Sequence, residues 1–172
     1  MKTRLLLSVL ALLLLPMLVQ ATHIKSGYIS YTMDPQNTSK FNFTLTVYTH
    51  HYSPAEDPEV NMRMGDGNTV VVPRTSVKKY NRNYDIETFQ WSYTYSVSGT
   101  YTVGWIGENR DNGIINLPDP SDQNGFYVYT TGKADPVSPN RHGAHLAGLP
   151  LMEGFVGEKL THNLAAYDAD GD

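Results

Sequence analysis

Three carboxylates alternate in the last five residues of the sequence, where Asp168, Asp170 and Asp172 occur in AAYDADGD. This spacing matches positions 1, 3 and 5 of an EF-hand loop, in which hard oxygen ligands surround a calcium ion. The glycine at position 6 and the glutamate at position 12 of such a loop would lie beyond residue 172. Close carboxylates repel one another unless a cation or solvent offsets their charge. These aspartates are therefore the candidate calcium ligands of an incomplete site, which we expect to be solvated and free of metal in this chain.

The histidines form a weaker candidate metal site. His50 and His51 are adjacent, so on a strand they would point to opposite faces and could not bind one ion together. His142 and His145 have the spacing of one helical face, but they lie in a stretch rich in glycine and proline without a His-Glu-x-x-His pattern. The sequence has no cysteine. We therefore expect no zinc site, and the sequence indicates no cofactor other than the candidate calcium ion.

Signatures of catalysis are missing from the sequence. It has no Gly-x-Ser-x-Gly elbow, no cysteine nucleophile and no glycine-rich phosphate loop. Carboxylates are frequent, but no pattern selects two of them as a glycosidase pair. We therefore expect a protein that is not an enzyme.

The first 21 residues have the pattern of a secretory signal peptide. A basic start is followed by the apolar stretch LLLSVLALLLLPMLV and by small residues that end at Ala21. Cleavage there would leave a chain without a membrane span. It would also remove Lys2 and Arg4, leaving 11 basic and 17 acidic residues. This negative balance argues against nucleic acid and anionic lipid as partners, so we expect an exported protein that is secreted or held at the cell surface.

Short segments with a period of two indicate an all-β fold. Tyrosine, threonine and valine are frequent in them, and these residues suit a pleated, half-buried surface. No long segment with a helical period occurs before residue 150, and the segments are separated by turn residues, as in an antiparallel sandwich. The predicted strands cover 27–31, 41–48, 69–73, 89–97, 100–106 and 125–131. The domain prediction is a signal peptide at 1–21, a β-sandwich at 22–132, a linker at 133–150 and the incomplete start of a second repeat at 151–172.

Two motifs carry a resemblance to a known type of domain. MGDGNTVVVPR at 64–74 contains a Gly-Asp-Gly hairpin turn, and YSVSGTYTV at 95–103 contains Tyr-x-x-x-Gly-x-Tyr-x-Val. Together they resemble the PKD-like domain, an immunoglobulin-type β-sandwich. With the segments at 21–31, 43–51, 108–118 and 156–172, their order is similar to that in the N-terminal region of large exported surface proteins of gliding bacteria. Met64 stands where that pattern usually has tryptophan.

The resemblance implies a non-catalytic extracellular module of a repeat-built cell-surface protein, used in adhesion or gliding. Its expected partners are neighbouring repeats of the same chain and a cell-surface glycan or protein. The resemblance also favours a calcium-binding loop at a repeat junction over an EF-hand for the terminal aspartates. An alternative function is a carbohydrate-binding accessory module of a secreted hydrolase, in which Trp91, Trp105 and the tyrosines would stack on sugars, although alternating aromatic residues more often belong to a core.

Overall fold

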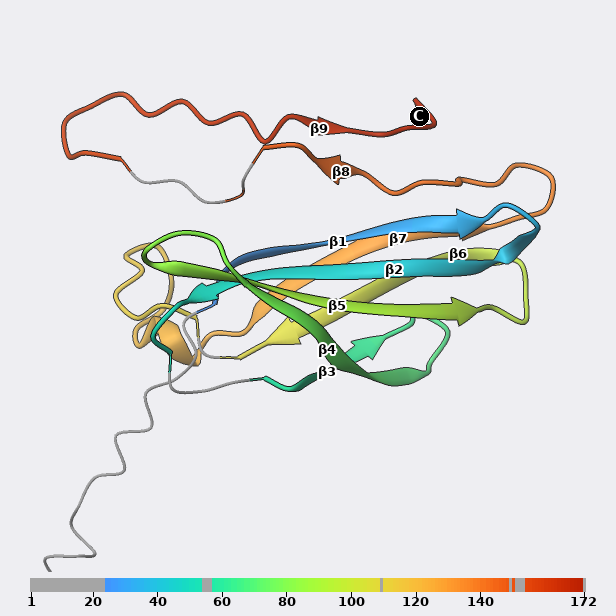
Figure 1. Ribbon diagram of the computed structural model, residues 1–172, viewed down its shortest axis with the longest axis horizontal. Helices are drawn as coiled ribbons and strands as arrows, with labels where there is room; N and C mark the ends of the chain where they lie inside the picture. The colour runs from blue at the N-terminus through green and yellow to red at the C-terminus, as the bar shows by residue number, and fades with distance from the viewer. Residues whose placement is uncertain (1–23, 54–56, 109, 149, 151–153, 172) are drawn as a thin grey trace, which may run out of the picture.

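A computed structural model describes residues 24–53, 57–108, 110–148, 150 and 154–171 of the chain (Figure 1). The predicted signal peptide at 1–21 and Asp172 lie outside these residues. Seven strands form one antiparallel sheet in the order β1-β2-β5-β4-β3-β6-β7, which confirms the all-β prediction. Their bounds are β1 Ile24–Asp34, β2 Asn37–His50, β3 Glu59–Arg63, β4 Thr69–Lys79, β5 Tyr84–Thr94, β6 Gly99–Gly107 and β7 Phe126–Ala134. Within the described ranges the helical structure is a single short turn, η1 at Ser121–Gln123, and no helix is long and apolar enough to cross a membrane.

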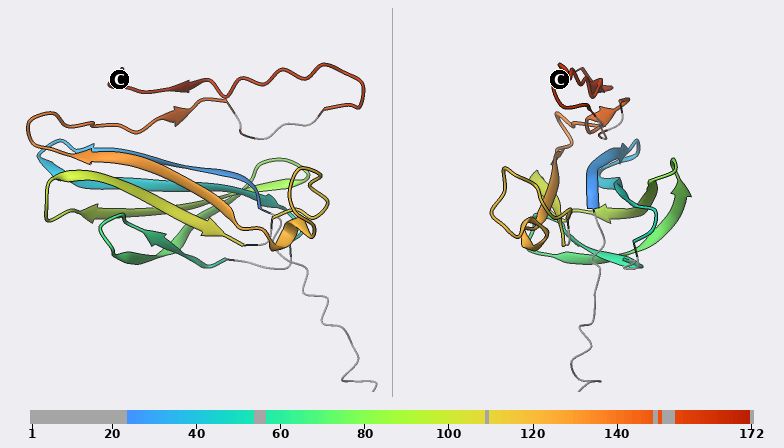
Figure 2. Two further views of the ribbon diagram at one scale, coloured as in Figure 1. Left: turned by 180° about the vertical axis from the view of Figure 1, so that it is seen from behind. Right: turned by 90° about the vertical axis from the view of Figure 1, so that its left-hand side faces the viewer.

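Strand β4 makes this one sheet fold over into two facing layers. The first half of β4 pairs with β3, from Thr69 opposite Arg63 to Pro73 opposite Glu59. Its second half pairs with β5. The register of the β4–β5 pair shifts between Arg74 and Ser76. One layer therefore contains β1, β2 and β5 and the other contains β3, β6 and β7, with β4 passing from one to the other (Figure 2). At the open side Tyr31 on β1 donates a hydrogen bond to the carbonyl oxygen of Thr131 on β7, at 3.3 Å.

The core lies between the two layers and is built by the alternation of the strands. On β2 the inward side chains are at most 3% exposed, as their period of two predicts. Aromatic rings stack in this core, with Phe41 and Phe43 at a centroid distance of 5.7 Å. The apolar side chains that face inward from β2 are Phe41, Phe43, Leu45 and Val47. Burial of this apolar surface is the main favourable contribution to folding, since the chain has no disulfide.

The GDGN turn at 65–68 confirms a local prediction from the sequence. Gly65 and Gly67 have φ angles of 82° and 92°, which residues with a Cβ rarely adopt. The carboxylate of Asp66 accepts a hydrogen bond from the backbone N–H of Asn68 at 3.0 Å. The turn thereby joins β3 to β4 and holds the buried Met64 in the core.

The segment after β7 returns along the edge of β1. The backbone N–H of Met33 donates to the carbonyl of Arg141 at 2.7 Å, and that of Gly143 donates to the carbonyl of Tyr31 at 3.0 Å. Beyond it, β8 at His145–Leu146 pairs with β9 at Ala166–Tyr167 (Figure 1). The predicted linker at 133–150 thus contains the end of β7 and an edge contact with β1. The division of the chain into a linker and a second repeat stays a prediction.

Candidate functional site

Strand β7 presents two tyrosines to solvent. Alternation turns Phe126 and Val128 toward the core, so Tyr127 and Tyr129 point outward. Their side chains are 52% and 62% exposed, and their rings stack at a centroid distance of 5.6 Å with 22° between the planes. Because tyrosine is large and partly apolar, an exposed stacked pair is a surface to which a ligand can bind.

A glycine on β6 lets this pair lie close to the sheet. Gly104 pairs with Tyr129 and lies diagonally across from Tyr127. A Cβ on Gly104 would lie 2.6 Å from the Tyr127 hydroxyl oxygen and 2.9 Å from its ring atom Cε2. Ile106, 42% exposed, pairs with Tyr127 and extends the same apolar surface. We call Tyr127, Tyr129 and Ile106 the tyrosine platform.

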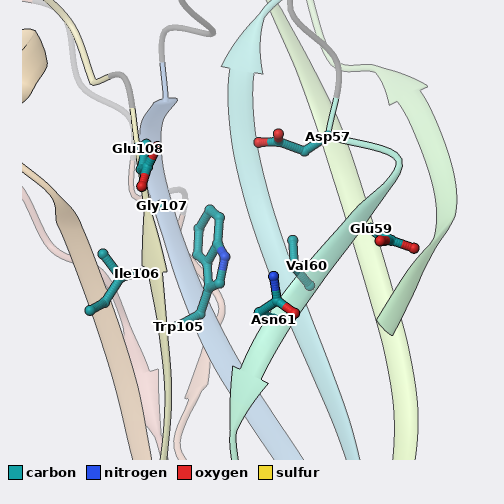
Figure 3. A pocket seen from close by; sticks show the side chains of 8 residues that line it. All are labelled: Asp57, Glu59, Val60, Asn61, Trp105, Ile106, Gly107 and Glu108. Atoms are coloured by element: carbon teal, nitrogen blue, oxygen red, sulfur yellow. The ribbon is translucent and has the colours of Figure 1, made fainter. Parts of the chain in front are cut away.

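A pocket opens beside the platform because β3 and β6 separate. They are paired only at Arg63 and Gly104. Continuing that antiparallel register would place Glu59 opposite Glu108, and like charges directly opposite each other destabilise a strand pair. The space between the strands has a volume of about 280 Å³ (Figure 3). We call it the acidic pocket, and it is lined by Asp57, Glu59, Val60, Asn61, Trp105, Ile106, Gly107 and Glu108.

Trp105 supplies a hydrogen-bond donor to the acidic pocket. The side chain is only 5% exposed, and its ring packs edge-on against Phe126 at a centroid distance of 6.5 Å. Figure 3 shows the nitrogen edge of the indole turned toward the β3 side of the pocket, where Asn61 lies. Among the described residues this N–H has no hydrogen-bond partner, and its nitrogen is not one of the buried polar atoms, so it is open to an acceptor in the pocket. The pocket therefore combines a free donor with carboxylate acceptors.

The electrostatics of the pocket are set by its carboxylates. Burial raises the pKa of Asp57, the nearby Glu108 raises it further, and Arg74 opposes both effects. The charged form of Asp57 is therefore disfavoured, because its carboxylate is partly removed from water and lies near Glu108. A positively charged or hydrogen-bond-donating group would relieve both effects.

The histidines named by the sequence are held in separate pairs with aspartates. Nε2 of His50 lies 3.3 Å from Asp111, whose other carboxylate oxygen is 2.5 Å from the Lys25 ammonium. Nδ1 of His51 lies 2.8 Å from Asp85. His51 lies just beyond the end of β2, and the two histidines contact different aspartates. In the part of the chain that the structure describes, no three His, Asp or Glu side chains are grouped so that they could hold a metal ion.

Asp168 and Asp170 have protein partners. The Asp170 carboxylate accepts hydrogen bonds from the backbone N–H groups of Arg141 and His142 at 2.6 and 2.8 Å. It also contacts Nδ1 of His142 at 2.8 Å, a hydrogen bond that, with the two backbone bonds, holds the pKa of Asp170 below its usual range. Asp168 accepts a bond from the N–H of Asp170. Calcium binding by Asp168, Asp170 and Asp172 stays a prediction, since Asp172 is outside the described residues.

The tryptophans do not form the exposed row that a sugar-binding face would need. Trp105 is buried, and Trp91 is partly buried and stacks on Phe43 at a centroid distance of 5.2 Å. An exposed aromatic pair is formed instead by Tyr127 and Tyr129 on β7, and the sequence pattern distinguishes neither of them from the other tyrosines. Both faces of this strand carry aromatic or apolar residues, so the alternation in GFYVYTT does not reveal which face is exposed.

This arrangement can bind a ligand that offers both a flat apolar face and polar groups. The platform supplies the stacking surface, and the acidic pocket supplies carboxylates, an amide and an indole N–H. Comparison of the chain with known protein families, with curated proteins and with solved structures finds no match. The function must therefore be argued from the geometry.

Proposed function

We propose that this chain is a non-catalytic, extracellular β-sandwich module of a repeat-built cell-surface protein, acting in adhesion or gliding. We propose further that it binds a surface glycan on the face formed by β3, β6 and β7. The observation that carries the proposal is the exposed, stacked pair of Tyr127 and Tyr129 beside a pocket with polar lining.

An immunoglobulin-type, PKD-like sandwich is supported by the strand order. Immunoglobulin constant-type domains place strands A, B, E and D in one sheet and C, F and G in the other. The order β1-β2-β5-β4 followed by β3-β6-β7 is the same when the strands are lettered along the chain. At the start of β6, Tyr101 donates a hydrogen bond to the carbonyl of Val97 at 2.7 Å, which is the contact made by a tyrosine corner.

A glycan fits this face better than a protein partner does. Sugar rings have C–H faces that pack on aromatic rings, and their hydroxyl groups both donate and accept hydrogen bonds. A stable protein interface usually buries about 1,200–2,000 Å² around an apolar centre. Here the three platform side chains are bordered by the polar Thr102 and Thr131 on the same face. The accessory module of a secreted hydrolase would use the same face, but its expected tryptophan row is not exposed.

Export is the second part of the proposal and has its own test. Residues 1–21 have the signal-peptide pattern, so the mature chain would begin at Thr22. N-terminal sequencing of protein collected from the medium of an expressing cell should give Thr22 as the first residue. Protein that stays in the cytoplasm with Met1 intact would contradict export.

Glycan-array binding of the purified chain tests the binding function. Wild-type protein should bind a defined set of glycans, and the double variant Tyr127→Ala/Tyr129→Ala should lose that binding. Tyr52→Ala is the matched control, because Tyr52 is 77% exposed and its ring packs edge-on against His51 rather than on the platform. Absence of glycan binding, or equal binding by the double variant and the wild type, would contradict the proposal.

A further inference from the structure

The acidic pocket carries more negative charge than a neutral sugar needs. Three of its lining residues are carboxylic acids, namely Asp57, Glu59 and Glu108, and none is a lysine, arginine or histidine. A neutral hydroxyl group donates one hydrogen bond but leaves the repulsion between Asp57 and Glu108, which Arg74 opposes, in place. An ammonium group donates three hydrogen bonds and also neutralises charge.

The distance between the tyrosine platform and the acidic pocket limits the size of the ligand that can carry this ammonium group. The acidic pocket lies on one side of β6 and Tyr127 lies on the other side, on β7. Neighbouring strands are about 4.8 Å apart, so the centre of the pocket and the Tyr127 ring are separated by roughly 10 Å, with Ile106 between them. Two linked sugar rings span a distance of this order. One ring would stack on the tyrosines while the next places its substituent in the pocket.

The indole of Trp105 adds a hydrogen-bond donor to the acidic pocket. Its N–H is directed into the pocket, as Figure 3 shows, and has no partner in the described part of the chain. A ligand hydroxyl or ring oxygen can accept this hydrogen bond. The pocket thus offers a donor from Trp105, an amide from Asn61 and carboxylate acceptors, which is the set that an amino sugar with free hydroxyl groups would use.

We propose that the ligand is a glycan with unacetylated amino sugars, whose ammonium group enters the acidic pocket while a neighbouring ring stacks on the tyrosine platform. This inference rests on the proposed glycan-binding function and names the class of sugar. A lysine side chain has the same ammonium group, but its flexible chain lacks the flat ring face that Tyr127 and Tyr129 can stack on. A metal ion would need several ligands around one point, and the described residues provide no such group.

Isothermal titration of the purified chain with matched tetrasaccharides tests this inference. The probes are a β-1,4-linked glucosamine tetramer and its fully N-acetylated counterpart, which has the same linkage but no charge. The glucosamine tetramer should bind at least about tenfold more tightly, because charge-assisted hydrogen bonds are about twice as strong as neutral ones. The variant Glu59→Gln/Glu108→Gln should lose this preference and keep the weaker binding. Glu158→Gln, which changes an exposed acid outside the pocket, should bind as the wild type does.

The outcomes separate the inference from the function on which it rests. Equal binding of the two tetramers, or tighter binding of the acetylated one, overturns the amino-sugar inference and leaves the glycan function standing. Failure of both tetramers, together with an array on which no glycan binds, overturns both. A tetralysine peptide that binds as tightly as the glucosamine tetramer also overturns the inference, because the pocket would then recognise cations without regard to the sugar ring.

Discussion

Replacement of Gly104 by alanine should weaken glycan binding without removing any atom of the platform. The new Cβ would lie 2.6 Å from the Tyr127 hydroxyl oxygen, whereas ordinary contacts begin at 3.4 Å. The ring must therefore move by roughly 0.8 Å or more, the difference between these distances. The clash involves the far end of a flexible, half-exposed side chain, so the ring can turn into solvent at little cost to the fold.

The size of the effect follows from what the displaced ring contributes. An aromatic stacking contact is worth about 0.5–1.5 kcal/mol. Its loss should weaken glycan binding roughly twofold to tenfold. Stability should change by less than about 1 kcal/mol, since alanine also restricts the unfolded chain. Isothermal titration with a glycan identified on the array measures the first quantity, and urea unfolding measures the second.

Thr102→Ala is the matched control for Gly104→Ala. This substitution also puts an alanine on the outer face of β6, but at a position that pairs with Thr131 and not next to the Tyr127 ring. We expect its affinity to equal that of the wild type. The reasoning is refuted if Gly104→Ala binds as tightly as the wild type, or if it unfolds so much more easily that lost affinity only reflects lost fold.

Three further perturbations test the scaffold. Glu87→Gln should lower the free energy of unfolding, measured with urea, by about 3 kcal/mol, because it removes the buried carboxylate to which Arg74 donates at 3.1 Å. A decrease below about 1 kcal/mol would contradict this. Tyr101→Phe should lower the free energy of unfolding by about 1 kcal/mol through loss of the corner hydrogen bond, and an unchanged melting temperature would argue against it. Asp170→Ala should speed amide exchange at His142. In the wild type the protection of this amide, measured as the ratio of its intrinsic to its observed exchange rate, should persist above about pH 4 and fade as the pH drops through the lowered pKa of Asp170; a pH-independent ratio would disprove this anchoring.

The strands that could be predicted from the sequence are those with strong alternation. Residues 41–48 and 89–94 lie in β2 and β5, and the inward side chains of 41–48 are buried as expected. Val97 was expected to continue the inward face of 89–97, but β5 ends at Thr94 and this side chain is 66% exposed. Strand β3 was missed because only Val60 and Met62 mark its inner face, among charged and polar residues typical of a turn.

The second half of β4 was missed for a similar reason. Its sequence RTSVKK is polar because this segment crosses between the layers and is largely exposed. Tertiary pairing with β5, rather than local preference, makes it a strand. The edge contact between β1 and Arg141–Gly143 could not be predicted from the sequence. Backbone hydrogen bonds form it, and these do not depend on the side chains of a segment rich in glycine and proline.

The candidate site could not be predicted from the sequence because it depends on how strands are paired. The acidic pocket exists because β3 and β6 part next to Arg63, so that Glu59 and Glu108, which lie far apart in the chain, line the same space. The alternative of a carbohydrate-binding module named Trp91, Trp105 and the tyrosines as a group. The burial of Trp105, the partial burial of Trp91 and the exposure of the two tyrosines on β7 follow from which face of each strand meets the core.

The most direct test of glycan recognition by the β3–β6–β7 face is a two-dimensional NMR titration of the isotope-labelled chain with a glycan from the array. Saturating glycan should shift the backbone amides of Ile106, Tyr127 and Tyr129 and the indole N–H of Trp105, while amides near His51 and Asp85 stay in place. No shift of the Trp105 indole and of the β7 amides, or shifts confined to another face of the sandwich, would contradict the account.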